Sequence, residues 1–148
     1  MDSMARTKKN KHNLFTCRSG VAAVEFALLL PVYLLLLFGM IAYAIYFGAA
    51  HAVQQLAADA ARTAIAGLTE QERNGLVEGY LARNAESYVL IDPARLSFVV
   101  GDKPNDASQY LVTVRYDASA LPIWELSPPL PLPSRIIAFS SSIRRGGI

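Results

Sequence analysis

The sequence predicts an α+β protein with a long N-terminal helix, a second helix and a small three-stranded antiparallel sheet. Two observations lead to this fold class. Near the N-terminus an apolar run, Phe26–Phe47, extends over 22 residues without a charged side chain. After Asp92–Pro93, apolar residues instead recur at every second position. The first pattern is typical of a membrane-spanning helix and the second of strands that are buried on one face.

The apolar run is long enough to cross a bilayer, because about 20 residues span the hydrocarbon core. No second run of this kind follows, so we expect a single pass through the cytoplasmic (inner) membrane. The run is twice as long as the apolar part of a secretory signal, and small residues precede it instead of following it. Charged residues flank the run asymmetrically: before it lie Arg6, Lys8, Lys9, Lys11 and Arg18 against Asp2, and after it Asp59 and Arg62 come first.

This asymmetry predicts a cytoplasmic N-terminus and a periplasmic or extracellular C-terminal part, because basic residues are retained on the cytoplasmic side. We therefore divide the chain into a basic leader (residues 1–20), a transmembrane segment (21–50) and an extracytoplasmic α+β domain (51–148). The leader holds five of the 14 basic and one of the 12 acidic residues, so the remainder has a net charge of −2. This balance gives no reason to expect nucleic-acid binding.

The helix is expected to continue beyond the membrane as an amphipathic rod. Apolar residues recur at spacings of three and four, the period of a helix face. A continuous helix from Val21 to Ala66 would measure about 70 Å. Gly67 is expected to end it, and a second helix, Glu70–Ala85, is expected to start with a capping box of Thr69 and Glu72. The apolar face of the rod comprises Val53, Leu56, Ala57, Ala60, Ala64 and Leu68.

Three strands complete the expected domain. Alternating apolar residues predict a hairpin of 96–100 and 110–116 around a turn-rich connection at 101–106. A third strand, 136–143, follows a proline-rich loop that holds the only tryptophan, Trp124. We expect the apolar residues of this loop to pack under the sheet, and a sticky surface for a partner is the alternative.

The junction between leader and apolar run carries the motif with the most functional information, Ser19–Gly20–Val21–Ala22–Ala23–Val24–Glu25–Phe26. A carboxylate at the edge of a membrane segment is energetically expensive and therefore calls for an explanation. Cleavage after Gly20 would make Glu25 the fifth residue of the new chain. This arrangement resembles the processing site of type IV prepilins and pseudopilins. With the continuation Glu25–Pro31, it is similar to the TadE family of minor pilin-like proteins of tight-adherence (Tad, Flp-type) pilus systems.

The resemblance implies a role in pilus assembly for named residues. Gly20 and Val21 would form the processing site, and a prepilin peptidase would be a partner. Glu25 and Phe26 would set the register between subunits, because the new amine of Val21 can pair with Glu25 of a neighbour. Pro31 is a candidate helix kink. The other implied partners are pilin-like subunits, the inner-membrane assembly platform and lipid, and the protein could become part of the pilus.

Two alternatives remain at this point. Glu25 can reach the cytoplasmic headgroups and have no further role. The chain can also be an uncleaved single-span anchor that presents a binding domain to an envelope complex. An enzyme is not expected: the histidines are His12 and His51, the only cysteine is Cys17 in the leader, and no cofactor or metal motif is present in the sequence.

Overall fold

The computed structural model describes residues 18–125 and 133–144. Predictions about the basic leader before Arg18, and about Leu126, Leu130 and Leu132 of the proline-rich loop, lie outside the described residues. The chain divides into two compact units, Met1–Leu36 and Leu37–Ile148. Unit 1 is described from Arg18 onward and consists of helix alone. Unit 2 holds the folded α+β domain together with the rest of that helix.

The long N-terminal helix is confirmed. Helix α1 comprises Arg18–Thr63, and a short 3-10 turn, η1 (Ala64–Ala66), follows it. The helical backbone continues through Pro31. The predicted apolar face is also confirmed within unit 2, where Val53, Leu56, Ala57, Ala60 and Ala64 are at most 1% exposed.

Leu68 departs from this pattern, because 86% of its surface is exposed. The helical period stops at η1, and Gly67, which follows, has an extended backbone. Leu68 therefore lies in the connection between the helices and not on the buried face of α1. Its assignment to the apolar face was wrong for this reason.

The second helix, α2 (Glu70–Asn84), begins with the predicted capping box. The Thr69 hydroxyl accepts from the Glu72 amide at 3.2 Å, and the Glu72 carboxylate accepts from the Thr69 amide at 3.2 Å. Together these bonds satisfy amides that have no partner at a helix start. A 3-10 turn, η2 (Ala85–Ser87), extends the helix, and η3 (Pro93–Arg95) leads into the sheet.

The sheet has the predicted three antiparallel strands in the order β1 (Leu96–Lys103), β2 (Asp106–Asp117) and β3 (Ile136–Arg144). The hairpin turn is tighter than expected. The strands extend into the predicted turn and leave only Pro104 and Asn105 between them. Asn105 has a φ of 70°, a left-handed conformation that asparagine tolerates better than most residues.

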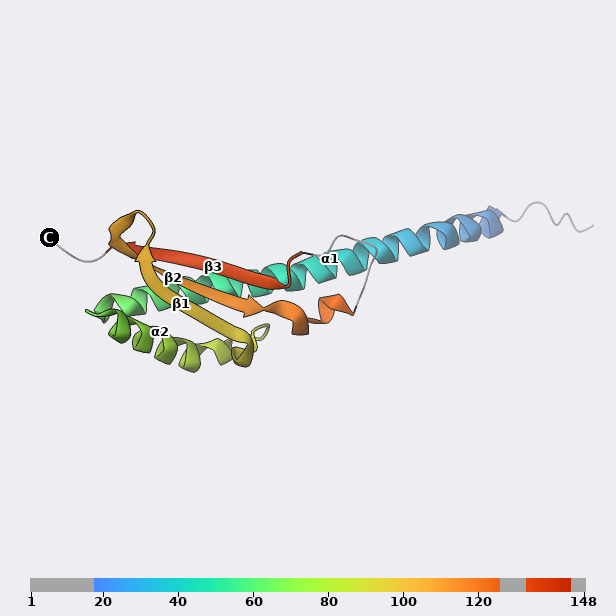
Figure 1. The fold of residues 1–148 in the computed structure, drawn as a ribbon. Coiled ribbons are helices and arrows are strands. Elements are labelled where there is room, and N and C mark those ends of the chain that lie inside the picture. The colour runs from blue at the N-terminus through green and yellow to red at the C-terminus, as the bar shows by residue number, and fades with distance from the viewer. Residues whose placement is uncertain (1–17, 126–132, 145–148) are drawn as a thin grey trace, which may run out of the picture. The chain divides into compact units, whose positions relative to one another are not determined.

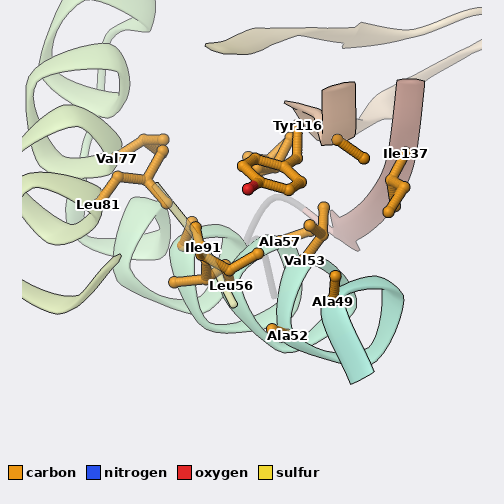
Figure 2. Close-up of a cluster of buried hydrophobic side chains, with 14 of the residues drawn as sticks. Ala49, Ala52, Val53, Leu56, Ala57, Val77, Leu81, Ile91, Tyr116 and Ile137 are labelled. Atoms are coloured by element: carbon orange, nitrogen blue, oxygen red, sulfur yellow. The ribbon is translucent and has the colours of Figure 1, made fainter. Parts of the chain in front are cut away.

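The core of unit 2 lies between one face of the sheet and the two helices (Figure 1). Figure 2 shows α1 residues, α2 residues, Tyr116 of β2 and Ile137 of β3 converging on one cluster. Six of the buried residues of α1 in this cluster are alanines, so the sheet can approach the helix closely. The cluster includes Ala49, Ala52, Val53, Leu56, Ala57, Val77, Leu81, Ile91, Tyr116 and Ile137.

The described part of the tryptophan segment packs inward, as predicted. It forms two 3-10 turns, η4 (Ala118–Ala120) and η5 (Pro122–Trp124). Leu121 and Ile123 are buried, and the Trp124 indole Nε1 donates a hydrogen bond to the Ala118 carbonyl at 2.6 Å.

Candidate functional site

The predicted processing and assembly residues all lie on the first turns of α1, in unit 1. Gly20, Val21, Glu25 and Phe26 are exposed, Val21 and Phe26 by 62% and 60%. Within the described residues, Glu25 forms no hydrogen bond or ion pair, so no contact in that part of the chain explains its presence. The Gly20–Val21 peptide bond lies in the first described turn of α1.

The helical backbone also fixes the relation between Val21 and Glu25. They are four residues apart and therefore lie on the same face of α1, with Cβ atoms about 5–6 Å apart. In a chain that began at Val21, its charged amine would be near its own Glu25 as well as available to a neighbour's. A carboxylate near the start of such a helix would also be stabilised by the helix dipole.

Helix α1 is the one candidate membrane span among residues 18–125 and 133–144, by length and composition. Large apolar side chains are exposed on it from Val21 to Ile41 and again at Phe47. In unit 1 this exposure occurs around the whole helix. Pro31, the candidate kink, lies within this exposed segment. A helix that is apolar on all sides is suited to lipid or to other helices, and not to water.

The residues of unit 2 that could carry chemistry lie apart from one another, and two of them have structural roles. His51 is exposed on α1 and lines an open groove of about 340 Å³ together with the first residues of β3. Ser140 exchanges a hydrogen bond with Thr113 across the sheet at 2.8 Å. Asp106 binds the amide and hydroxyl of Ser108 in the hairpin, and these bonds lower the pKa of its carboxyl group.

The described residues contain no group of three or more His, Cys, Asp or Glu side chains that could hold a metal ion. The groove beside His51 is lined by apolar side chains, the Gln54 amide and the first residues of β3. None of these supplies a nucleophile next to a base.

Small residues of α1 that could promote association between membrane helices have two different environments. Ala22, Ala23 and Ala44 are exposed. Ala42 is buried, and Gly48 lies so close to Leu90 that a Cβ atom there would be 2.8 Å from the leucine Cδ1. Ala42 and Gly48 therefore contribute to the packing of unit 2.

Sequence reasoning missed Arg73, whose side chain joins the two helices. Its exposure is only 9%, its Nε donates to the Gly67 carbonyl and its Nη2 to the Leu68 carbonyl, both at 3.1 Å. The guanidinium carbon lies 5.0 Å from the ring centroid of Tyr110. The only signal in the sequence was the position of Arg73 near the start of a helix with a predicted capping box, shortly after Gly67.

The comparison with known proteins finds a similarity in the same part of the chain that carries Gly20 and Glu25. No curated protein and no solved structure matches the chain. The family described as TadE-like protein matches residues 20–62, a segment that begins at the predicted cleavage site and ends one residue before α1 does. The chain therefore carries a TadE-like domain at residues 20–62.

Proposed function

We propose that this protein is a minor pilin-like subunit that takes part in assembly of a Tad-type pilus. In this proposal it inserts with its leader in the cytoplasm, a prepilin peptidase cleaves it after Gly20, and α1 then packs against other pilin-like subunits. The observation that carries the proposal is the combination of Gly20 and Glu25 on the exposed first described turns of a lipid-length helix, within a segment that matches the TadE-like family.

The charge of Glu25 gives cleavage a physical consequence. A carboxylate and an ammonium group are both expensive to bury in lipid, and pairing them removes most of that penalty. Before cleavage Val21 has no amine, and the leader adds five positive charges next to the helix start. Processing would therefore create the partner that Glu25 requires and remove the segment that blocks it.

The pair can form within one subunit or between two. Within one subunit Val21 and Glu25 are neighbours on the helix surface, where such a pair is worth only about 0.2–0.5 kcal/mol. Between subunits the pair would be removed from water and would fix the axial register of two helices. The proposal requires the second arrangement, with Phe26 packed beside it.

The exposed surface of α1 also supports a role in packing. Residues 26–36 have no partner within the described part of unit 1, although this segment is long and apolar. Unit 2 has a complete core of its own and does not need a neighbouring subunit to bury it. Assembly through α1 would leave that unit free to prime the fibre, to cap its tip or to contact the inner-membrane platform.

The test is the N-terminal residue of the protein recovered from membranes of cells that contain a prepilin peptidase. A chain that starts at Val21 supports the proposal, and Gly20→Ala should then retain the leader and fail to assemble. Gly75→Ala is a matched control, because a Cβ atom at Gly75 in α2 has no neighbour within 4 Å. Glu25→Gln should be cleaved normally and still assemble poorly.

The second candidate is an uncleaved anchor that presents unit 2 to an envelope complex. Its support is that unit 2 has a complete core and an open groove between α1 and β3. A chain that starts at Met1 beside an active peptidase, with Gly20→Ala indistinguishable from Gly75→Ala, would favour this reading over the pilin-like one.

A further inference from the structure

The boundary of unit 2 falls inside the apolar run. Unit 1 ends at Leu36, so Phe26–Leu36 supplies 11 residues, or about 17 Å of helix. Even counted from Val21, the helix reaches only about 24 Å, whereas the hydrocarbon core is about 30 Å thick. A span that starts just after Glu25 needs about nine more residues and reaches Ile45. The first turns of unit 2 must then lie in lipid.

The exposed side of these turns fits that environment. Leu37, Met40 and Ile41 are 50%, 71% and 42% exposed, and Phe47 is 56% exposed further on. The opposite side is already covered by the folded domain, since Ala42 and Ala49 are at most 1% exposed. Both belong to the same buried cluster as Ile123 of η5 and Ile137 of β3.

The height of the domain along α1 follows from these contacts. Leu90 lies against Gly48, three residues past Ile45, or about 5 Å beyond the hydrocarbon boundary. Headgroups add about 5–7 Å on each side of the core. Val89 and Leu90 line one hollow together with Leu121 and Pro122, so the connection around Leu90 and the start of the tryptophan segment both lie at the depth of the headgroups.

The residues at this end of unit 2 are also of the kind that an interface favours. Val89, next to Leu90, is 98% exposed, and Ile136 at the start of β3 is 52% exposed. Trp124 is half-buried, and the guanidinium carbon of Arg135 lies 5.1 Å from its ring centroid. Tryptophan is enriched at membrane interfaces, and arginine can bind lipid phosphates.

We propose that this end of unit 2, formed by residues 88–92, residues 121–124 and the start of β3, rests in the lipid headgroup layer, with the contact at Ala42 reaching the edge of the hydrocarbon core. The domain would then be held against the bilayer and not suspended above it on a bare helix. The proposal rests on the membrane span of the preceding subsection, and its partner is a phospholipid surface continuous with the lipid around α1.

Depth measurements on the full-length chain in phospholipid vesicles test the proposal. A nitroxide label is placed on single cysteines in a Cys17→Ser background, and its collision rates with oxygen and with a water-soluble nickel chelate are measured. Val89→Cys probes the proposed contact. Leu68→Cys is the matched control, because it is 86% exposed and lies about 25 Å further along the helix direction. Leu29→Cys reports on the span itself.

We expect the nickel collision rate at Val89 to be several-fold lower than at Leu68, with the oxygen rate retained. Equal nickel rates at the two sites, with Leu29 in lipid, would overturn the proposal and leave the span intact. A water-exposed label at Leu29 would instead refute the span. Loss of both collision rates at Val89, or dipolar broadening between labels, would show a protein or a second copy there and would also overturn the proposal.

An unlabelled measurement complements this test, because Trp124 is the only tryptophan in the chain. Lipids brominated near the headgroup end of the acyl chain should quench its fluorescence in vesicles of the wild-type protein. Absence of quenching would contradict a lipid contact at η5.

Discussion

Replacement of Arg73 by methionine tests whether this side chain holds the α1–α2 connection together. Its two donors satisfy the carbonyls of Gly67 and Leu68, and its guanidinium lies over the ring of Tyr110. Methionine keeps the length and the packing of the stem but removes the charge and both hydrogen bonds. The change therefore isolates the polar contribution from the loss of volume.

The expected cost can be worked out contact by contact. Gly67 is buried, so loss of its charge-assisted hydrogen bond costs about 1.5–3 kcal/mol. Leu68 is exposed, and water can replace the second bond at little cost. The partly desolvated contact with Tyr110 adds about 1 kcal/mol. The sum is about 3 kcal/mol, and Arg73→Lys, which keeps the charge but not the forked geometry, should lose about half of it.

The assay is thermal unfolding of the full-length protein in detergent, followed by the fluorescence of Trp124. For a unit of this size, 1 kcal/mol corresponds to about 4 °C, so Arg73→Met should lower Tm by about 12 °C. Arg83→Met is the matched control, because Arg83 lies exposed on the same helix and should change stability by less than about 0.5 kcal/mol. If Arg73→Met and Arg83→Met have the same Tm, the contacts of Arg73 with Gly67, Leu68 and Tyr110 do not stabilise the protein as we infer.

Three further predictions concern neighbouring features. Gly67→Ala should destabilise the protein by about 2 kcal/mol or more, because the new Cβ would lie 2.8 Å from the backbone nitrogen of Arg73. Gly48→Ala should cost under about 1 kcal/mol, because its Cβ would meet only the end of the flexible Leu90 side chain. Equal Tm shifts for the two variants would contradict this. Hydrogen bonds from two backbone amides hold the pKa of Glu72 below its ordinary value of 4.5, so wild-type stability should fall as the pH drops below 4.5 through that lowered pKa, and Glu72→Gln should show a shallower loss in acid denaturation. Tyr110→Phe removes a 3.1 Å hydrogen bond to a buried carbonyl of α1 and should cost about 1 kcal/mol in urea unfolding, whereas an unchanged midpoint would refute that bond.

The elements of this fold could be predicted because each has a local cause. The capping box of Thr69 and Glu72 and the two-residue period of the strands involve residues close together in the sequence. Leu68 was misplaced because a helical period carries no information on where the helix stops. Arg73 was missed because its role depends on Tyr110, which only the fold brings to it.

The candidate site also combines features that the local sequence determines with features that only the fold determines. Gly20 and Glu25 could be singled out because their spacing is a property of the sequence itself. The packing of residues 37–50 inside unit 2 could not be predicted, because this segment has the apolar composition of a membrane helix. Only the structure shows that Ala42 and Gly48 on one side of it are covered by the domain.

Helix α1 therefore has two kinds of surface along one continuous sequence. From Phe26 to Leu36 it has no partner in the described chain, and large apolar residues point outward on every side. From Ala42 to Ala64 one side consists of buried residues, mostly alanines, that belong to the core of unit 2. Larger residues in the second segment must disturb the fold of unit 2, since packed interiors have no room for them. If the proposed function holds, polar residues in the first segment would leave that fold intact and affect insertion and contacts between subunits. The two segments should thus yield separable classes of mutants, one that loses the domain and one that keeps a folded domain but cannot assemble.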